Sequence, residues 1–494
     1  MSTSFSHKGH VCRRFFLFSH LRNNSGEVCG ILSGAMNEPV SHPKVLRFVF
    51  TLAFVLAAPF FYLASAAAQE KNQPLLLLIS VDGMRPDYVT SADAHGAQLP
   101  NLRRFLKEGV YAEGVTGVVP TVTYPSHTTL VTGVWPAQHG ISANTTFDPL
   151  QKNFQGWFWY AEDIHAPTLW DAAAAAGRTT ASVHWPVTVG AHITWNIPEF
   201  WRANTPDDGK LLRAVSTSGL LEEPRAALGD YPVGTNSSAE VDELRARYAQ
   251  WILEHKHPSL LTLHLAALDH IEHETGPFSP ESIAILERLD TVIGSLRAAA
   301  ERLAPGRAFV AVVSDHGFVK TDSQLNLFPA FRDAKLFTLD EKGKIVDWKA
   351  MPWVTGGSAA IVLKDPNDAA TLSRVRELLG KLAADPANGI DRVLEADELH
   401  KRGGFPGASF FVGLKPGWRT GSTLEGPVLS KTKIGGAHGE LPDLPDLRAA
   451  FFLIGPGITA GRSLDLIDMR DVAPTLAHAI GLALPSASGK NLLP

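Results

Sequence analysis

Seven residues that can bind metal ions or act as a nucleophile stand at the ends of apolar runs, between positions 82 and 438. They are Asp82, Thr123, Asp269, His273, Asp315, His316 and His438. Carboxylates, imidazoles and one hydroxyl are the donors that zinc takes, and there are enough of them for two divalent ions. Because the Thr can also act as a nucleophile, the set predicts a two-metal hydrolase.

Two of these motifs place a pair of ligands close together. Asp269 and His273 are four residues apart, so one helical turn directs both toward the same ion. His270, Glu272 and Glu274 add further donors, and the alternative is a solvated polar loop. Asp315 and His316 end a buried run before Gly317, whose conformational freedom permits the bend that brings both onto one ion.

The other motifs have simpler alternatives. Asp82 precedes Gly83, as an Asp that begins a turn also does. His438 lies in a Gly-rich segment and alone resembles an ordinary loop His. Thr123 precedes a helix-like segment, whose N-terminus favours negative charge. The nearby hydroxyls of Thr121 and Ser126 compete with it for the role of nucleophile.

Short apolar runs alternate with helical patterns along the chain, which predicts an α/β fold with a mostly parallel sheet covered by helices on both faces. The predicted strands are Leu75–Val81, Ala181–Trp185, Leu260–Ala266, Phe309–Ser314 and Ala449–Ile454. The predicted helices are Pro100–Glu108, Ser126–Thr132, Ala239–His255, Pro280–Leu303 and Met469–Ile480. Ligands bind at the carboxyl ends of strands in such sheets, which is where Asp82, Asp269 and Asp315 fall.

The organisation predicts a catalytic domain of residues 69–330 and 419–494, with an α+β insertion at 331–418. Within the insertion, Ile361–Leu363 and Ser409–Leu414 have the pattern of strands, and Asp368–Ala383 that of a helix. The Gly- and Pro-rich stretch Trp185–Pro232 predicts long loops that form a lid or rim over the site.

The first 68 residues have the features of a leader rather than of a folded core. Residues 48–64 form an apolar run after Lys44 and Arg47, and small residues follow it, which is typical of a secretory signal over 36–68. The alternative is an uncleaved membrane anchor, and residues 1–35 form a leader of doubtful status. Both cysteines, Cys12 and Cys29, precede the signal, so the mature chain lacks disulfides.

The composition describes an ordinary globular protein. The chain has 494 residues, of which 45% are hydrophobic and 19% charged, with a net charge of −5. This balance excludes disorder and predicts no nucleic-acid partner. We expect a periplasmic or secreted protein that acts on a small molecule and has no stable membrane span once the signal is removed.

The motifs together resemble the nucleotide pyrophosphatase/phosphodiesterase family of the alkaline phosphatase superfamily. They are V-D-G-M-R-P-D, T-Y-P-S-H-T-T-L-V-T-G-x-x-P-x-x-H-G-I, D-x-x-x-H-x-x-G-P, S-D-H-G and H-G-E, with a further match at Asn144–Pro149. The resemblance implies an alkaline-phosphatase-like core with two Zn²⁺ ions, one bound by Asp269, His273 and His438. It implies that Asp82, Asp315, His316 and the Thr123 hydroxyl bind the other.

The resemblance also implies roles for residues around the nucleophile. Thr123 would form a phosphothreonine intermediate, and Asn144 would bind the substrate and stabilise the oxyanion. Tyr124 would contact the substrate by stacking on a base or another flat group. The chain departs from the family at His264 and Leu268, where the family often has Tyr and Pro. Nucleotide preference is therefore open, whereas phosphoester chemistry is not.

These features predict an exported two-zinc phosphodiesterase or nucleotide pyrophosphatase whose substrate is a phosphoester, with a nucleotide as one candidate. The alternative with the same metal core is a phosphomonoesterase or phosphonate hydrolase, for which Arg85 and Lys320 are the candidate extra contacts to the non-bridging oxygens. A remote alternative is a non-catalytic binding protein, although such proteins usually lose ligands and all seven are present here.

Overall fold

The computed structural model describes residues 73–153, 156–202 and 205–494. The chain divides into two units, Met1–Lys71 and Asn72–Pro494, and every described residue belongs to the second. The predicted leader at 1–35, the predicted signal at 36–68 and both cysteines lie outside the described residues. No helix within the described part of the chain has the length and apolar character needed to cross a membrane.

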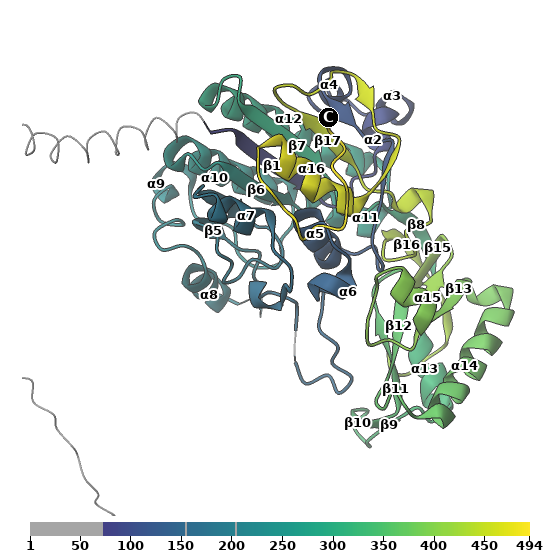
Figure 1. Ribbon diagram of the computed structural model, residues 1–494. Helices are drawn as coiled ribbons and strands as arrows, with labels where there is room; N and C mark the ends of the chain where they lie inside the picture. The colour runs from purple at the N-terminus through teal and green to yellow at the C-terminus, as the bar shows by residue number, and fades with distance from the viewer. Residues whose placement is uncertain (1–72, 154–155, 203–204) are drawn as a thin grey trace, which may run out of the picture. The chain divides into compact units, whose positions relative to one another are not determined.

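An eight-stranded sheet forms the centre of the structure, in the order β18-β2-β17-β7-β1-β6-β4-β5 (Figure 1). Five neighbouring strands run parallel. They are β5 (Trp195–Ile197), β4 (Thr180–Val183), β6 (Leu260–Leu265), β1 (Leu75–Val81) and β7 (Ala308–Val313). The other edge contains β17 (Phe451–Ile454), β2 (Val110–Tyr111) and β18 (Arg462–Ser463).

The predicted α/β fold with a mostly parallel sheet is confirmed, with one difference in strand direction. The apolar run at Ala449–Ile454 forms β17, which is antiparallel to both β7 and β2. A strand buried on both faces has the same apolar pattern in either direction, so the sequence could not distinguish the two.

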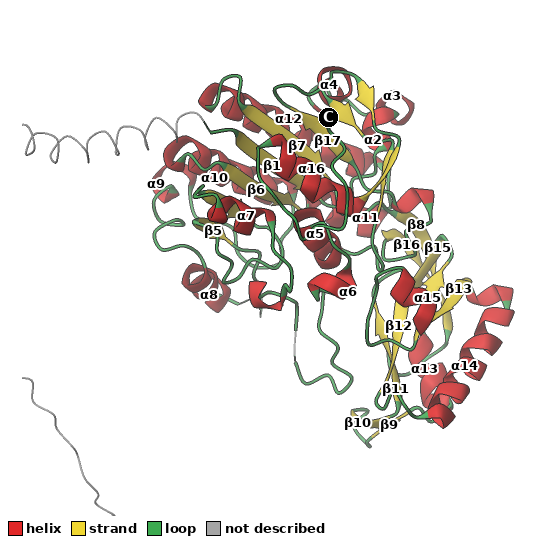
Figure 2. Ribbon diagram, in the orientation of Figure 1, coloured by secondary structure: helices red, strands yellow, loops and turns green. Residues whose placement is uncertain are grey.

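Helices cover both faces of the sheet (Figure 2). Residues of β1 point alternately to the two faces, so they pack in two different cores. Leu77 and Ile79 pack in the core that includes α4 (Leu102–Glu108), α10 (Ala239–Lys256) and α12 (Pro280–Leu303). Leu76 and Leu78 pack in the core that includes α5 (Thr123–Thr132), α7 (Leu169–Ala175) and α16 (Val472–Ala479). The short helix α11 (Ala267–Thr275) follows β6 directly.

A second, antiparallel sheet lies within the segment between His316 and His438. Its strands are β11 (Ala350–Val354), β12 (Ser358–Leu363), β14 (Phe410–Leu414) and β13 (Ile390–Glu395). With α13 (Leu327–Asp333) and α14 (Ala369–Ala384) it encloses its own hydrophobic core, and α15 (Ala396–Lys401) follows β13. The division into a catalytic domain of 69–330 and 419–494 and an insertion at 331–418 remains a prediction.

A three-stranded sheet connects this segment to the central sheet. It contains β15 (Gly417–Thr420), β8 (Val319–Leu325) and β16 (Leu429–Ala437), in the order β15-β8-β16. The strand β8 begins soon after His316, and the antiparallel strand β16 returns and ends directly before His438. The pairing of these two strands therefore brings His438 back to the carboxyl end of β7.

The stretch Trp185–Pro232 contains more regular structure than the predicted long loops. It includes the edge strand β5 and the helices α8 (Asp207–Val215) and α9 (Arg225–Leu228). These elements are short and lie among Gly and Pro residues, which concealed them in the sequence. The remaining elements are α2 (Asp87–Thr90), α3 (Ala92–His95), β3 (Gly114–Thr116), α6 (Pro136–His139), β9 (Phe337–Leu339), β10 (Ile345–Trp348) and β19 (Leu466–Asp468).

Candidate active site

The seven candidate residues meet at the carboxyl ends of three neighbouring strands. Asp82 follows β1, Asp315 and His316 follow β7, and Asp269 lies in the first turn of α11, just after β6. Since β6, β1 and β7 are adjacent and parallel, their carboxyl ends share one edge of the sheet. Thr123 and His438 reach this edge from α5 and from the end of β16.

Asp82, Asp315 and His316 form a buried group. The His316 Nε2 lies 3.4 Å from Asp82 Oδ1 and 3.1 Å from Asp315 Oδ2. The second oxygen of each carboxylate is occupied, because Gly83 N–H donates to Asp315 Oδ1 at 3.2 Å and His264 Nε2 lies 2.9 Å from Asp82 Oδ2. The three atoms that face one another have no hydrogen-bond partner, which is unusual for buried polar atoms and is typical of ligands directed at an ion.

Asp269, His273 and His438 form a neighbouring and more open group. Asp269 Oδ1 lies 3.4 Å from His273 Nε2 and 3.5 Å from His438 Nε2, and it also lacks a hydrogen-bond partner. The His273 side chain is 44% exposed, whereas those of Asp315 and His316 are fully buried. The His438 ring stacks on His316 at 3.6 Å between centroids, so the two groups adjoin.

Backbone carbonyls orient the three histidines toward the site. In each ring Nδ1–H donates to a carbonyl oxygen, which leaves Nε2 directed at the carboxylates. The pairs are His316 with Gly317 at 3.1 Å, His438 with Thr121 at 3.0 Å and His273 with Gly436 at 3.3 Å. The helix α11 supplies His273 one turn after Asp269, as the spacing predicted.

The electrostatics of the site favour a bound cation. Burial raises the pKa of Asp82, and repulsion from Asp315 and Asp269 raises it further. Burial alone would lower the pKa of His316, but attraction to Asp315 and Asp82 raises it to about 10. Burial lowers the pKa of His438 to about 3, so its ring is neutral at neutral pH.

Thr123 is the hydroxyl that the fold presents to the site. It is the first residue of α5, it lines the cleft beside Asp82, and it is 8% exposed. The Thr121 hydroxyl donates to the Glu440 carbonyl at 2.8 Å and accepts from Gly439 N–H at 3.1 Å. Ser126 is completely buried, and neither competitor lines the cleft.

Asn144 lies beside Thr123 with its amide group free to donate. Its Oδ1 accepts the N–H of Tyr124 at 2.9 Å, and its side chain lines the same cleft. Because Oδ1 is thereby assigned as the acceptor, the amide nitrogen is left for a substrate oxygen. Among the first residues of α5, the Tyr124 N–H is taken by Asn144 and Pro125 has no N–H, so the Thr123 N–H is the one that adds to this anion-binding surface.

Of the other sequence candidates, Tyr124 lines the same cleft, whereas Arg85 and Lys320 lie elsewhere. The Tyr124 ring is fully buried against Trp157, with 5.2 Å between centroids, and its hydroxyl donates to Glu199 Oε1 at 3.2 Å. Arg85 pairs with Asp87 and Asp446, while Lys320 is exposed on β8. Neither Arg85 nor Lys320 lines the described cleft.

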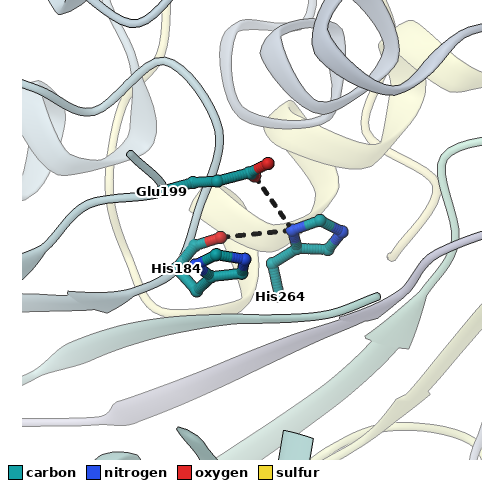
Figure 3. A group of neighbouring side chains, drawn as sticks. All are labelled: His184, Glu199 and His264. Carbon is teal, nitrogen blue, oxygen red and sulfur yellow. Dashed lines mark hydrogen bonds and ion pairs between the residues drawn. The ribbon is translucent and has the colours of Figure 1, made fainter. Parts of the chain in front are cut away.

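Several residues of the cleft had no signal in the sequence. They are Trp157, His184, Glu199, Trp201 and Arg245. His264, which departs from the family pattern, is buried between Asp82 and Glu199, and Leu268 is buried in the core. Figure 3 shows the contact of His264 with Glu199. Polar wall residues of this kind depend on tertiary packing, so no local spacing identifies them.

Known proteins resemble this chain in sequence. Residues 76–440 match the model of the type I phosphodiesterase / nucleotide pyrophosphatase family. The bis(5'-adenosyl)-triphosphatase ENPP4 of Homo sapiens is 25% identical over 424 residues, which is 83% of this chain and 78% of that protein. Human ectonucleotide pyrophosphatase/phosphodiesterase family member 5 is 25% identical over 305 residues, or 60% of this chain and 55% of the relative.

Solved structures share the fold. An inactive threonine-to-alanine variant of murine ectonucleotide pyrophosphatase/phosphodiesterase 5, in complex with AMP, has a TM-score of 0.60 at 21% identity. The match covers 85% of this chain and 97% of that one. The human counterpart also gives a TM-score of 0.60, at 22% identity. These similarities confirm the predicted alkaline-phosphatase-like core.

Proposed function

The chain belongs to the type I phosphodiesterase / nucleotide pyrophosphatase family, and on that premise we propose that it is an exported two-zinc hydrolase. It would cleave phosphodiester or pyrophosphate bonds through a covalent intermediate on Thr123. The observation that carries the proposal is the convergence of six ligand side chains beside one hydroxyl, four of which direct into the site a buried atom that lacks a hydrogen-bond partner.

The spacing of the facing atoms supports zinc as the ion. Ligand atoms ~2.0–2.1 Å from a tetrahedral ion are separated by ~3.3–3.4 Å, the edge of the tetrahedron. The distances between Nε2 and carboxylate oxygen atoms in the two groups run from 3.1 to 3.5 Å. We assign one ion to Asp82, Asp315, His316 and the Thr123 hydroxyl, and the other to Asp269, His273 and His438.

Two zinc ions bound there would supply positive charge and Lewis acidity to the entering and departing oxygens. In the first step Oγ1 of Thr123 bonds to phosphorus, the bond from phosphorus to the leaving oxygen breaks, and the hydroxyl proton passes through solvent to the leaving oxygen. In the second step the oxygen of water bonds to phosphorus, the bond from phosphorus to Oγ1 breaks, and one proton of that water returns to Oγ1. Asn144 and the N-terminus of α5 donate hydrogen bonds to a non-bridging oxygen throughout.

The relatives support the threonine and the substrate class. The related murine structure is an inactive threonine-to-alanine variant with bound AMP, and the human relative is named for hydrolysis of a bis-adenosyl triphosphate. We infer from these that a nucleotide is a candidate substrate for this chain. We place the mature protein in the periplasm or outside the cell, since the predicted signal agrees with the ectoenzyme names of the relatives.

The test replaces the nucleophile and leaves the metal ligands intact. Thr123→Ala should lower turnover of a phosphodiester by several orders of magnitude while zinc content stays near two ions per chain. Thr123→Ser keeps a hydroxyl and should retain much of the activity. Near-wild-type turnover by Thr123→Ala would refute the proposed nucleophile. Turnover of a phosphomonoester or a phosphonate above that of the diester would overturn the substrate class.

A further inference from the structure

A third polar group lies in the wall of the cleft, and one of its members, His264, contacts Asp82 of the proposed zinc sites. Figure 3 shows the three side chains of this group. It consists of His184 after β4, Glu199 after β5 and His264 near the end of β6. All three side chains are buried, and one donor atom from each lies within 4.8 Å of the others. By composition and spacing alone, this group also qualifies as a metal site.

The hydrogen bonding of His264 argues against a third ion. Its Nε2 lies 2.9 Å from Asp82 Oδ2, and its Nδ1 lies 3.2 Å from Glu199 Oε2 and 3.2 Å from the His184 carbonyl oxygen. A histidine binds a metal through a nitrogen lone pair, and both ring nitrogens already face oxygen atoms. Four buried atoms of the two proposed zinc groups have no hydrogen-bond partner, namely Asp82 Oδ1, Asp269 Oδ1, Asp315 Oδ2 and His316 Nε2, whereas no such atom is on His184, Glu199 or His264.

These contacts continue into a chain of hydrogen bonds that spans the site. The second oxygen of Glu199 accepts the Tyr124 hydroxyl at 3.2 Å. The backbone N–H of Tyr124 donates to Asn144 at 2.9 Å. One end of the chain is therefore the carboxylate of Asp82, and the other end is the amide that faces the substrate. Tyr124, in the middle, is the residue that follows the nucleophile.

We propose that Glu199 and His264 are positioning residues that fix the Asp82 carboxylate relative to Thr123 and Asn144. The inference rests on the proposed function, because it takes Asp82 as a metal ligand and Thr123 as the nucleophile. His264 occupies Oδ2 of Asp82, so that only Oδ1 is directed at the ion. Glu199 joins His264 to Tyr124. The side chains of Glu199 and His264 cannot turn without breaking a buried hydrogen bond.

Two substitutions of His264 test its contact with Asp82 and its contact with Glu199 separately. In His264→Gln the amide nitrogen takes the place of Nε2 and keeps the contact to Asp82, whereas in His264→Asn it takes the place of Nδ1 and keeps the contact to Glu199. We expect His264→Asn to weaken binding of one metal ion by about 10- to 100-fold. The same variant should change the visible absorption of the Co²⁺-loaded protein, and His264→Gln should alter both properties much less.

Substitution of Glu199 tests the part of the hydrogen-bond series that leads to Tyr124 and Asn144. Glu199→Gln should retain both ions and lower kcat about tenfold or more, with KM changed less than about threefold, because the geometry of attack is affected rather than substrate binding. The matched control is Asp290→Asn, which removes another buried carboxylate that accepts hydrogen bonds from Asn101 and Leu102 and that does not line the cleft. It should lower the melting temperature without changing kcat or the Co²⁺ spectrum.

The outcomes distinguish this inference from the proposed function. Wild-type kcat and an unchanged Co²⁺ spectrum in both Glu199→Gln and His264→Asn would overturn the positioning role. Three ions per wild-type chain, one of them lost in His184→Ala, would overturn it in favour of a third metal site. If Glu199→Gln does not fold, the comparison of the two His264 variants decides. A wild-type protein that neither binds metal nor hydrolyses phosphodiesters would instead contradict the proposed function itself.

Discussion

Replacement of Asn144 is the most informative perturbation of transition-state stabilisation at this site. Its Oδ1 accepts the Tyr124 N–H at 2.9 Å, while its amide nitrogen is available to a phosphoryl oxygen. The two halves of the side chain therefore have different functions, one structural and one chemical. Asn144→Asp keeps an acceptor for Tyr124 but removes the donor and adds a negative charge. Asn144→Ala removes both contacts.

The structure predicts that the two variants rank oppositely in stability and in activity. Loss of one oxyanion donor costs ~2.7–4 kcal/mol of transition-state stabilisation, which lowers kcat by about 100- to 1,000-fold in Asn144→Ala. Asn144→Asp should fall further, because its carboxylate repels the phosphoryl oxygens. In stability the order reverses, since an unpaired Tyr124 N–H costs Asn144→Ala ~1–3 kcal/mol that Asn144→Asp does not lose.

The assay is steady-state hydrolysis of a phosphodiester at saturating zinc, combined with thermal unfolding of each variant. Zinc content measured on the same samples ensures that any loss of rate does not come from loss of the ions. If both variants retain kcat within about threefold of the wild type, Asn144 does not stabilise the transition state. If Asn144→Asp is the less stable of the two, the assigned contact to Tyr124 is wrong.

Three further predictions concern the ions and the neighbouring hydroxyl. Asp269→Asn and Asp315→Asn should each reduce zinc content from about two ions to about one per chain, and elemental analysis that still finds two in both would contradict the assigned ligand sets. Removal of zinc by a chelator should lower the melting temperature, because each ion present at 100 times its Kd stabilises the fold by ~2.7 kcal/mol; an unchanged melting temperature would argue against ions bound only by the folded state. Thr121→Val leaves the Gly439 N–H and the Glu440 carbonyl unpaired, so the free energy of unfolding should fall by ~2–4 kcal/mol in denaturant titrations. Turnover by that variant should still far exceed that of Thr123→Ala, and equal losses in the two would leave the nucleophile unassigned.

The parts of the fold that follow from local patterns could be predicted from the sequence. The strand β1 is buried on both faces and ends directly before Asp82, so its apolar run located both the strand and the ligand. The helix α12 begins at Pro280 after Ser279, whose side chain accepts the Ser282 N–H, and these are sequence-readable capping signals. The direction of β17 depends on its partners in the sheet and has no local signal.

The beginning of α5 shows how a local rule can mislead. A helix that starts at Ser126, after Pro125, was the expected arrangement, but the helix starts at Thr123. Proline is tolerated in the first turn of a helix, where its missing N–H would have no partner in any case. The difference matters for function, because it places Thr123 itself at the helix N-terminus.

The wall of the cleft could not be predicted because it is assembled from distant and weakly patterned segments. Glu199 follows β5, a strand of three residues in a Gly- and Pro-rich stretch, and no spacing connects it to Tyr124 or His264. His264 was visible only as a departure from the family pattern. In the structure the ring of His264 has a carboxylate on each side, Asp82 at Nε2 and Glu199 at Nδ1. The departure from the family pattern at His264 therefore goes together with the presence of Glu199 in the cleft wall.

The stereochemistry at phosphorus tests the central claim most directly. Hydrolysis of a P-chiral phosphorothioate diester in ¹⁸O-labelled water reports how many in-line displacements occur. Attack by Thr123 followed by attack by water gives two inversions, so the account predicts net retention of configuration. Net inversion would show that water attacks the substrate directly, and it would contradict a covalent intermediate on Thr123.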